Sequence, residues 1–131
     1  MKNKGLAAFK YYTDKIGFFP IIPLLIITRN KKLKINALID SGATISVFKE
    51  EVAQQLGIDI EIGKKITLGG VGGRINGYVH ELKLRIADKE FLCPVVFSHE
   101  YLVSLNLLGR SVFFEEFKII FEEKKKKLSL E

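Results

Sequence analysis

The residues of this sequence whose types and spacing could do chemistry are a carboxylate, a hydroxyl and a glycine in succession: Asp40, Ser41 and Gly42. One apolar run, residues 37–39, leads to the carboxylate, and another, residues 45–48, follows shortly after the glycine. Val, Ile and Phe favour strands, so Asp40 is predicted at the end of a strand, on a rigid element but open to a cleft. Gly42 permits a tight turn or a close backbone approach there. Asp-Ser-Gly is also common in plain turns, so these three residues alone leave catalysis and a structural turn both open.

A second element lies far downstream, where two apolar residues are followed by glycine and arginine: Leu107, Leu108, Gly109 and Arg110. Together with Asp-Ser-Gly-Ala at residues 40–43, it makes the chain resemble the retropepsin-like aspartic proteases, the single-domain, homodimeric relatives of pepsin. The cellular branch of that family is the most similar, and the resemblance runs from about Pro20 to the end. It implies a mainly β fold: a closed six-stranded acid-protease barrel with one or two short helices, active as a symmetric homodimer. We expect residues 1–19 to form an N-terminal lead and residues 20–131 a single protease domain.

The number of carboxylates that the reaction needs then predicts the oligomeric state. Amide hydrolysis by carboxylates needs one that is ionised, to accept a proton from water, and one that is protonated, to polarise the carbonyl. Two carboxylates held close share one proton in this way. The sequence has a single Asp-Ser-Gly, so the second carboxylate is predicted to come from a second copy, with two Asp40 side chains meeting at a two-fold axis. The reaction needs no cofactor, no metal and no covalent intermediate.

The resemblance also implies roles for the neighbours of Asp40. The Ser41 hydroxyl would bond to the partner's loop, Gly42 would let the two loops approach, and Ala43 would line the substrate side. Leu107, Leu108 and Gly109 would support the active loop. Arg110 would brace the dimer through an ion pair whose partner the sequence does not identify.

A glycine-rich stretch between two strand-like segments is predicted to be a mobile hairpin tip. It lacks the Lys-Ser/Thr that ends a phosphate-binding P-loop. In the family this place is taken by the flap that folds over a bound peptide and binds it by strand addition, although a plain surface hairpin stays open as an alternative. The expected flap residues are Gly69, Gly70, Val71, Gly72 and Gly73.

The hydrophobic pattern predicts short strands and a few short helices. Residues 21–28 and 33–39 alternate as an antiparallel pair, and residues 49–56 have the apolar spacing of a helix that Gly57 ends. Residues 6–12 favour a short N-terminal helix, and residues 58–62 a strand or extended connector. Further strands are expected at 74–86, 90–97, 118–121 and 128–130, and an amphipathic helix at 110–117.

Composition narrows the class of protein. The formal net charge is +6, but the basic residues are spread and lack an accompanying RNA-binding aromatic motif, so nucleic acid is not an expected partner. The single Cys93 fits a reducing, cytoplasmic location and is expected to be a buried structural thiol. His80 and His99 have no partners at metal-ligand spacing and are expected to be structural or at the surface. Residues 16–27 are apolar but too short for a stable membrane span, although weak membrane contact stays open.

These observations favour an aspartic endopeptidase that acts on peptide or protein substrates as a homodimer. The alternative is a retropepsin-like module that dimerises or binds peptides without cutting them, because a fold does not fix a function. A basic nucleic-acid or membrane-surface protein is the third reading. An intact Asp-Ser-Gly-Ala distinguishes the first from the second, since a non-catalytic module has no need of that carboxylate.

Overall fold

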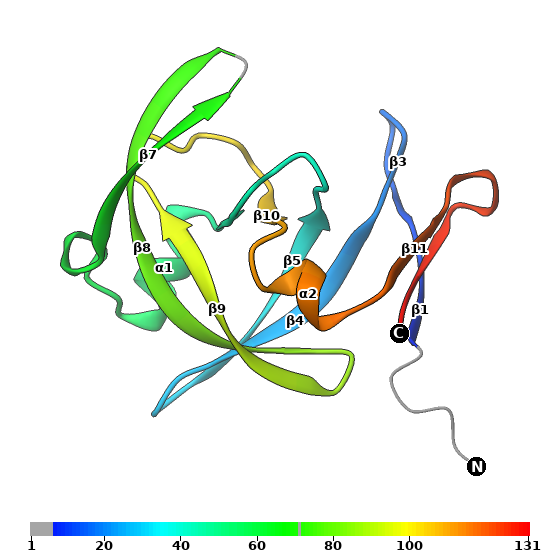
Figure 1. Cartoon of the computed structure of the whole chain (residues 1–131), viewed down its shortest axis with the longest axis horizontal. Coiled ribbons are helices and arrows are strands. Elements are labelled where there is room, and N and C mark those ends of the chain that lie inside the picture. Colours follow the sequence, from blue (N-terminus) through cyan, green and yellow to red (C-terminus); the bar gives the residue numbers. More distant parts are fainter. Residues whose placement is uncertain (1–6, 71) are drawn as a thin grey trace.

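Six strands close on themselves into a barrel in the computed structural model, which describes residues 7–70 and 72–131 (Figure 1). Each strand of the ring is hydrogen-bonded to the next, and the pairing of β4 with β8 closes it. β7 (Lys64–Gly70) pairs with β8 outside the ring. The closed, mainly β barrel confirms the fold predicted from the sequence. In ring order the strands are β4 (Ile21–Ile27), β5 (Lys32–Ile39), β10 (Asn106–Leu108), β6 (Ser46–Val47), β9 (Lys89–Phe97) and β8 (Gly73–Ile86).

Two antiparallel hairpins build most of the barrel; the pairing of the first and the individual strands of the second were expected. In β4, Ile22, Leu24 and Ile26 alternate inward and are almost fully buried, as a strand with one face on a core requires. β8 and β9 meet through a two-residue turn at Ala87 and Asp88, which both have positive φ (49° and 65°). Positive φ at both central residues gives a turn whose twist matches that of the flanking strands.

The helices are short and one of them replaces an expected strand. α1 (Glu50–Leu56) buries three apolar side chains and ends at Gly57, whose φ of 72° is the left-handed C-terminal conformation, as predicted. The expected strand or extended connector at 58–62 is wrong, because the chain there forms the 3-10 helix η1 (Ile60–Ile62). Of its two isoleucines only Ile60 enters the core, and Ile62 is 78 % exposed. The alternation in the sequence therefore does not mark a buried strand face.

α2 (Phe113–Glu116) is shorter than the helix expected at 110–117. Arg110 and Ser111 donate their backbone N–H groups to the loop after Asp40 instead, and Val112 has a φ of 67°. Because a φ of 67° is not helical, the helix can begin only after Val112. Phe113 is fully buried, so the expected packing of this segment on the core is present.

A second, three-stranded sheet joins the two ends of the chain, in the order β1, β12, β11. The expected N-terminal helix is wrong. Leu6 lies outside the described residues, whereas residues 7–10 form β1 (Ala7–Lys10), which pairs with β12 (Lys127–Leu130). Tyr12 begins β2 (Tyr12–Thr13), which forms a small hairpin with β3 (Phe18–Phe19). A helix would leave Phe9 without the partner it has opposite the buried Leu128. β11 (Ile119–Glu122) and β12 are joined by a 3-10 turn, η2 (Glu123–Lys125), which agrees with the two expected strands and their charged connection.

Among the described residues, no helix has the length and apolar composition that crossing a bilayer requires.

Candidate active site

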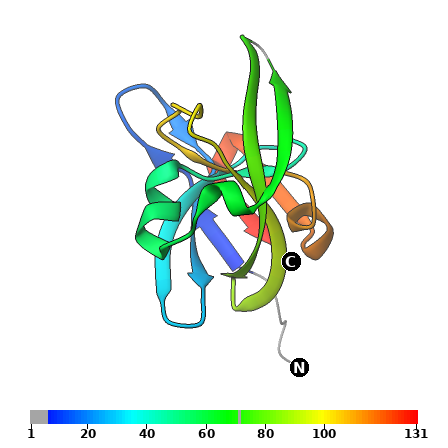
Figure 2. The same ribbon diagram turned by 90° about the vertical axis from the view of Figure 1, so that its left-hand side faces the viewer.

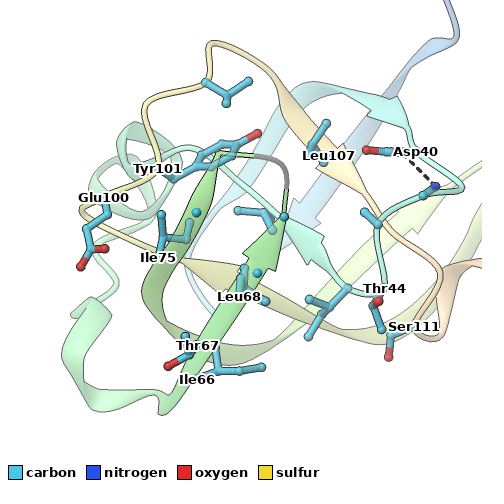
Figure 3. A pocket seen from close by; sticks show the side chains of 18 of the residues that line it. Asp40, Thr44, Ile66, Thr67, Leu68, Ile75, Glu100, Tyr101, Leu107 and Ser111 are labelled. Atoms are coloured by element: carbon cyan, nitrogen blue, oxygen red, sulfur yellow. Dashed lines mark hydrogen bonds between the residues drawn. The ribbon is translucent and has the colours of Figure 1, made fainter.

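Asp40 follows directly on β5 and is held by backbone on both sides. Its N–H donates to the carbonyl of Leu108 (2.9 Å), which continues the parallel pairing of β5 and β10 by one residue. Its Oδ1 accepts the N–H of Gly42 (2.9 Å), the contact that is dashed in Figure 3. A Cβ at residue 42 would lie 3.2 Å from this same oxygen, so a glycine suits the position. The carboxylate is therefore half-buried and oriented, with its second oxygen left for the adjoining cavity.

The segment after β10 crosses the Asp40 loop at very close range. Arg110 and Ser111 donate to the carbonyls of Ala43 (2.9 Å) and Thr44 (2.8 Å). Between them and β10, Gly109 lies so close to Ile45 that an added Cβ would meet its backbone at 2.5 Å. Residues 107–110, which the sequence analysis identified as the downstream element, therefore occupy three different environments. Leu107 lines the cavity, Leu108 is in the core, and Gly109 and Arg110 contact the loop through their backbones.

Two buried polar side chains that the sequence reasoning missed fasten this crossing. Ser46 accepts the N–H of Gly109 on its Oγ (3.0 Å). Asn106 accepts the N–H of Lys49 (2.8 Å) and donates to the carbonyl of Asn36 (2.9 Å), which ties β10 to β5 and to the start of α1. Buried polar groups are kept in a fold when they are fully hydrogen-bonded. In the sequence, the signal for the role of Asn106 was its position as a polar residue immediately before the apolar pair and the glycine of residues 107–109.

A cavity of about 1090 Å³ opens beside Asp40, with the β7–β8 hairpin along one wall. Figure 2 shows this hairpin standing out from the body of the barrel. Gly69, Gly70 and Gly73 line the cavity, and Gly72 has a φ of 99°, which favours glycine. Val71 lies outside the described residues. Of the loop residues, Gly42 and Ala43 line the cavity with Asp40, whereas Ser41 is exposed and is not among the described lining residues.

The loop between β9 and β10 forms another wall, which sequence reasoning identified only as a loop. Tyr101 donates its hydroxyl to the carbonyl of Leu105 (2.7 Å), and its ring faces the cavity (Figure 3). Burial raises the pKa of Tyr101 to about 12, and the negative charge of Asp40 adds to the shift. The tyrosine therefore stays protonated at any pH at which a carboxylate mechanism operates, and it keeps the loop closed on itself.

His99, in the same loop, joins it to the body of the protein. Its Nδ1 lies 2.5 Å from Glu50 on α1, and its Nε2 lies 2.7 Å from Glu61 on η1. Both ring nitrogens can donate only in the imidazolium form. The hydrogen bonds to Glu61 and then Glu50 raise the pKa of His99, in agreement with that form. The structural or surface role expected for this histidine matches these contacts.

The other residues that the sequence analysis considered as possible catalytic, metal-binding or ion-pairing groups make structural contacts. His80 approaches the carbonyl of Ile60 (2.8 Å). Cys93 is fully buried, and burial raises the pKa of its thiol to about 11, which makes it a poor nucleophile. Within residues 7–70 and 72–131, no group of three His, Cys, Asp or Glu side chains could hold a metal ion. In that same part of the chain, Arg110 has no carboxylate within 4 Å; its side chain lies 3.5 Å from the Thr44 hydroxyl.

The closed six-stranded barrel, the segment 109–111 that crosses the Asp40 loop, and the carboxylate of Asp40 together define the retropepsin-like aspartic protease fold. A family model described as "gag-polyprotein putative aspartyl protease" matches residues 27–115, and the chain belongs to that family. Comparison with curated protein sequences finds no match.

Solved structures agree with the fold. A retropepsin-like aspartic protease from Rickettsia conorii is similar over 98 % of this chain and 96 % of its own, with 25 % identity and a TM-score of 0.69. The EIAV protease complexed with the inhibitor HBY-793 is similar over 80 % of this chain and 94 % of its own, with 21 % identity and a TM-score of 0.59.

Proposed function

We propose that this protein is an aspartic endopeptidase in which a water molecule is activated between two Asp40 carboxylates, one from each chain of a homodimer. The observation that carries the proposal is the placement of Asp40. Its oriented carboxylate borders the cavity of about 1090 Å³, next to a glycine-rich hairpin. Family membership supports protease activity in general. The requirement for a second carboxylate supports the dimer, because the chain has only one such loop.

The mechanism follows from one proton shared between the two carboxylates. The ionised Asp40 takes a proton from the water while the protonated one gives its proton to the peptide carbonyl oxygen, so the water oxygen bonds to the carbonyl carbon. A tetrahedral diol results. The proton taken from the water then passes to the amide nitrogen, the C–N bond breaks, and a diol hydroxyl returns its proton to the other carboxylate, so the pair again holds one proton. The two carboxylates exchange roles in each cycle, and no bond to the enzyme forms.

The residues around Asp40 take supporting roles in this proposal. The exposed Ser41 hydroxyl is available to the partner's loop, and Gly42 allows the close approach of the two loops. Arg110 is exposed and has no carboxylate partner in the described part of its own chain, which suits an ion pair formed across the dimer. The β7–β8 hairpin acts as the flap, and its backbone adds to an extended peptide as a neighbouring strand.

The test combines an inactivating variant with a mixing experiment. Asp40→Asn keeps the shape of the side chain and removes the acid–base group, so hydrolysis of a fluorogenic peptide mixture should fall by at least about 100-fold. Excess Asp40→Asn added to wild-type chains should also suppress their activity, because mixed dimers have one carboxylate. Sedimentation velocity checks that the variant still dimerises.

Two results would contradict the proposal. Equal hydrolysis by wild type and Asp40→Asn would exclude Asp40 as the catalytic group. Wild-type activity that survives an excess of the dimerising variant would exclude a site shared between chains. Peptide binding without any hydrolysis would instead support the alternative, a non-proteolytic binding or dimerisation module.

A further inference from the structure

The cavity that contains Asp40 has a second carboxylate, Glu100, which the proposed mechanism does not use. Glu100 lies in the loop between β9 and β10, at the end of the cavity far from Asp40 (Figure 3). The other described lining residues are apolar, glycine or hydroxyl-bearing, and none of them is Lys or Arg. In a chain with a formal net charge of +6, this cavity is therefore locally acidic.

Glu100 is positioned by its neighbours without being neutralised by them. Its Oε1 accepts the backbone N–H of Asn76 on β8 (3.1 Å), and its own N–H donates to the hydroxyl of Ser98 (3.0 Å). Ser98 also donates to the carbonyl of Asn76 (2.5 Å), so the loop is fastened to the middle of the β7–β8 hairpin at two points. Across the residues that the structure describes, no Lys, Arg or His nitrogen comes within 4 Å of the Glu100 carboxylate. A carboxylate can accept about four hydrogen bonds, so capacity remains for a ligand.

We propose that Glu100 selects peptides that have a basic side chain, Lys or Arg, a few residues away from the scissile bond. The inference rests on the proposed function and specifies its substrate. A peptide extended along the β7–β8 hairpin advances about 3.3 Å per residue, so a side chain several positions from the bond at Asp40 reaches the far end of the cavity. There it forms a charge-assisted hydrogen bond with a fixed carboxylate. A homodimer has two copies of Glu100 related by the two-fold axis, so one basic position is selected on each side of the scissile bond.

The experiment is a lysine scan through a cleavable peptide of otherwise apolar and neutral residues, with glutamine at the same positions as the uncharged reference. For wild type, kcat/KM should rise about five-fold for lysine over glutamine at one position on each side of the cut, and the gain should shrink at high salt. Glu100→Gln keeps an oxygen for the N–H of Asn76 but removes the charge, so the ratio of kcat/KM for lysine over glutamine peptides should fall to about one. Glu100→Lys should reverse the preference toward glutamate.

Glu51→Gln is the matched control, because Glu51 is an exposed carboxylate on α1 outside this cavity. It should retain the full lysine preference. If wild type cuts peptides but favours lysine nowhere, or if Glu100→Gln keeps the preference, the assignment of Glu100 is wrong and the protease activity stands.

If no peptide is cut, the proposed function fails, and the role of Glu100 is decided by binding. Fluorescence anisotropy then compares lysine and glutamine peptides on Asp40→Asn with and without Glu100→Gln. Tighter binding of lysine peptides that needs Glu100 supports the inference, and equal binding overturns it.

Discussion

Replacing Gly109 by alanine should destabilise the protein and disturb its active loop. The added Cβ would lie 2.5 Å from both the carbonyl carbon and oxygen of Ile45 and 2.9 Å from its nitrogen. Ordinary contacts begin near 3.4 Å, so the two crossing segments would have to separate by almost 1 Å. All three atoms belong to the backbone, so no side chain can rotate away to relieve the overlap.

The same crossing is held by short hydrogen bonds, and separation would stretch them. The bonds concerned join Gly109 to Ser46, Arg110 to Ala43 and Ser111 to Thr44. Overpacking of a well-packed site typically costs 1–3 kcal/mol, and losing about one net hydrogen bond adds about 1 kcal/mol, so we expect Gly109→Ala to lower the free energy of unfolding by about 2–4 kcal/mol. The urea midpoint should fall with little change in the slope of the transition.

Gly17→Ala is the matched control, since nothing lies within 4 Å of a Cβ built at that position. Its free energy of unfolding should stay within about 0.5 kcal/mol of wild type. Peptide hydrolysis should fall sharply for Gly109→Ala and stay unchanged for Gly17→Ala, under conditions in which both are folded. If Gly109→Ala unfolds at the wild-type urea concentration, the close approach of Gly109 to Ile45 does not constrain the fold and the reasoning is refuted.

Two further predictions concern the walls of the cavity. The pKa of His99 is raised above its ordinary 6.5 by Glu61 and Glu50, so its contribution to stability is complete below about that pH and is lost as pH rises through the folded-state pKa. The free energy of unfolding measured in urea should therefore decline as the pH rises above 6.5, and His99→Gln should flatten this decline; an unchanged slope in the variant would exclude His99 as its source. Replacing Gly70 and Gly72 with valine should sharply reduce both hydrolysis and binding of a statine-like inhibitor under conditions in which the variant is folded. The urea midpoint should also fall, because valine is strained at the φ of 99° that Gly72 adopts. Wild-type hydrolysis and binding in that variant would make the stretch an ordinary surface hairpin.

The sequence predicted those parts of the fold that local patterns determine. Alternation located β4, β5, β8 and β9, and Gly57 marked the end of α1, because these signals act within a few residues. The N-terminal strand β1 was missed because its alternation becomes meaningful only opposite Leu128, more than a hundred residues away. Residues 58–62 gave the opposite error, because the alternation is present but the described chain there turns into η1 and makes no strand pairing.

The residues of the candidate site likewise fall into two groups, those that the local sequence identifies and those that it does not. Asp40 and Gly109 were identifiable from their own short motifs. Asn106, Ser46, Tyr101 and Glu100 matter through contacts with distant backbone or through their place on a cavity wall. Neither kind of information is contained in the local sequence around them.

The position of β12 between β1 and β11 bears on how the proposed protease activity could be switched on and off. Because both edges of this last strand are occupied by the same chain, no strand has to be borrowed from a second copy to complete the sheet. The barrel is likewise closed by its own β4 and β8. Separation of the proposed dimer would then release two chains that keep their native structure and lack only the opposing carboxylate. Such chains form a dormant reserve, which a rise in local concentration, for example when copies are brought together on a larger assembly, would activate without any refolding.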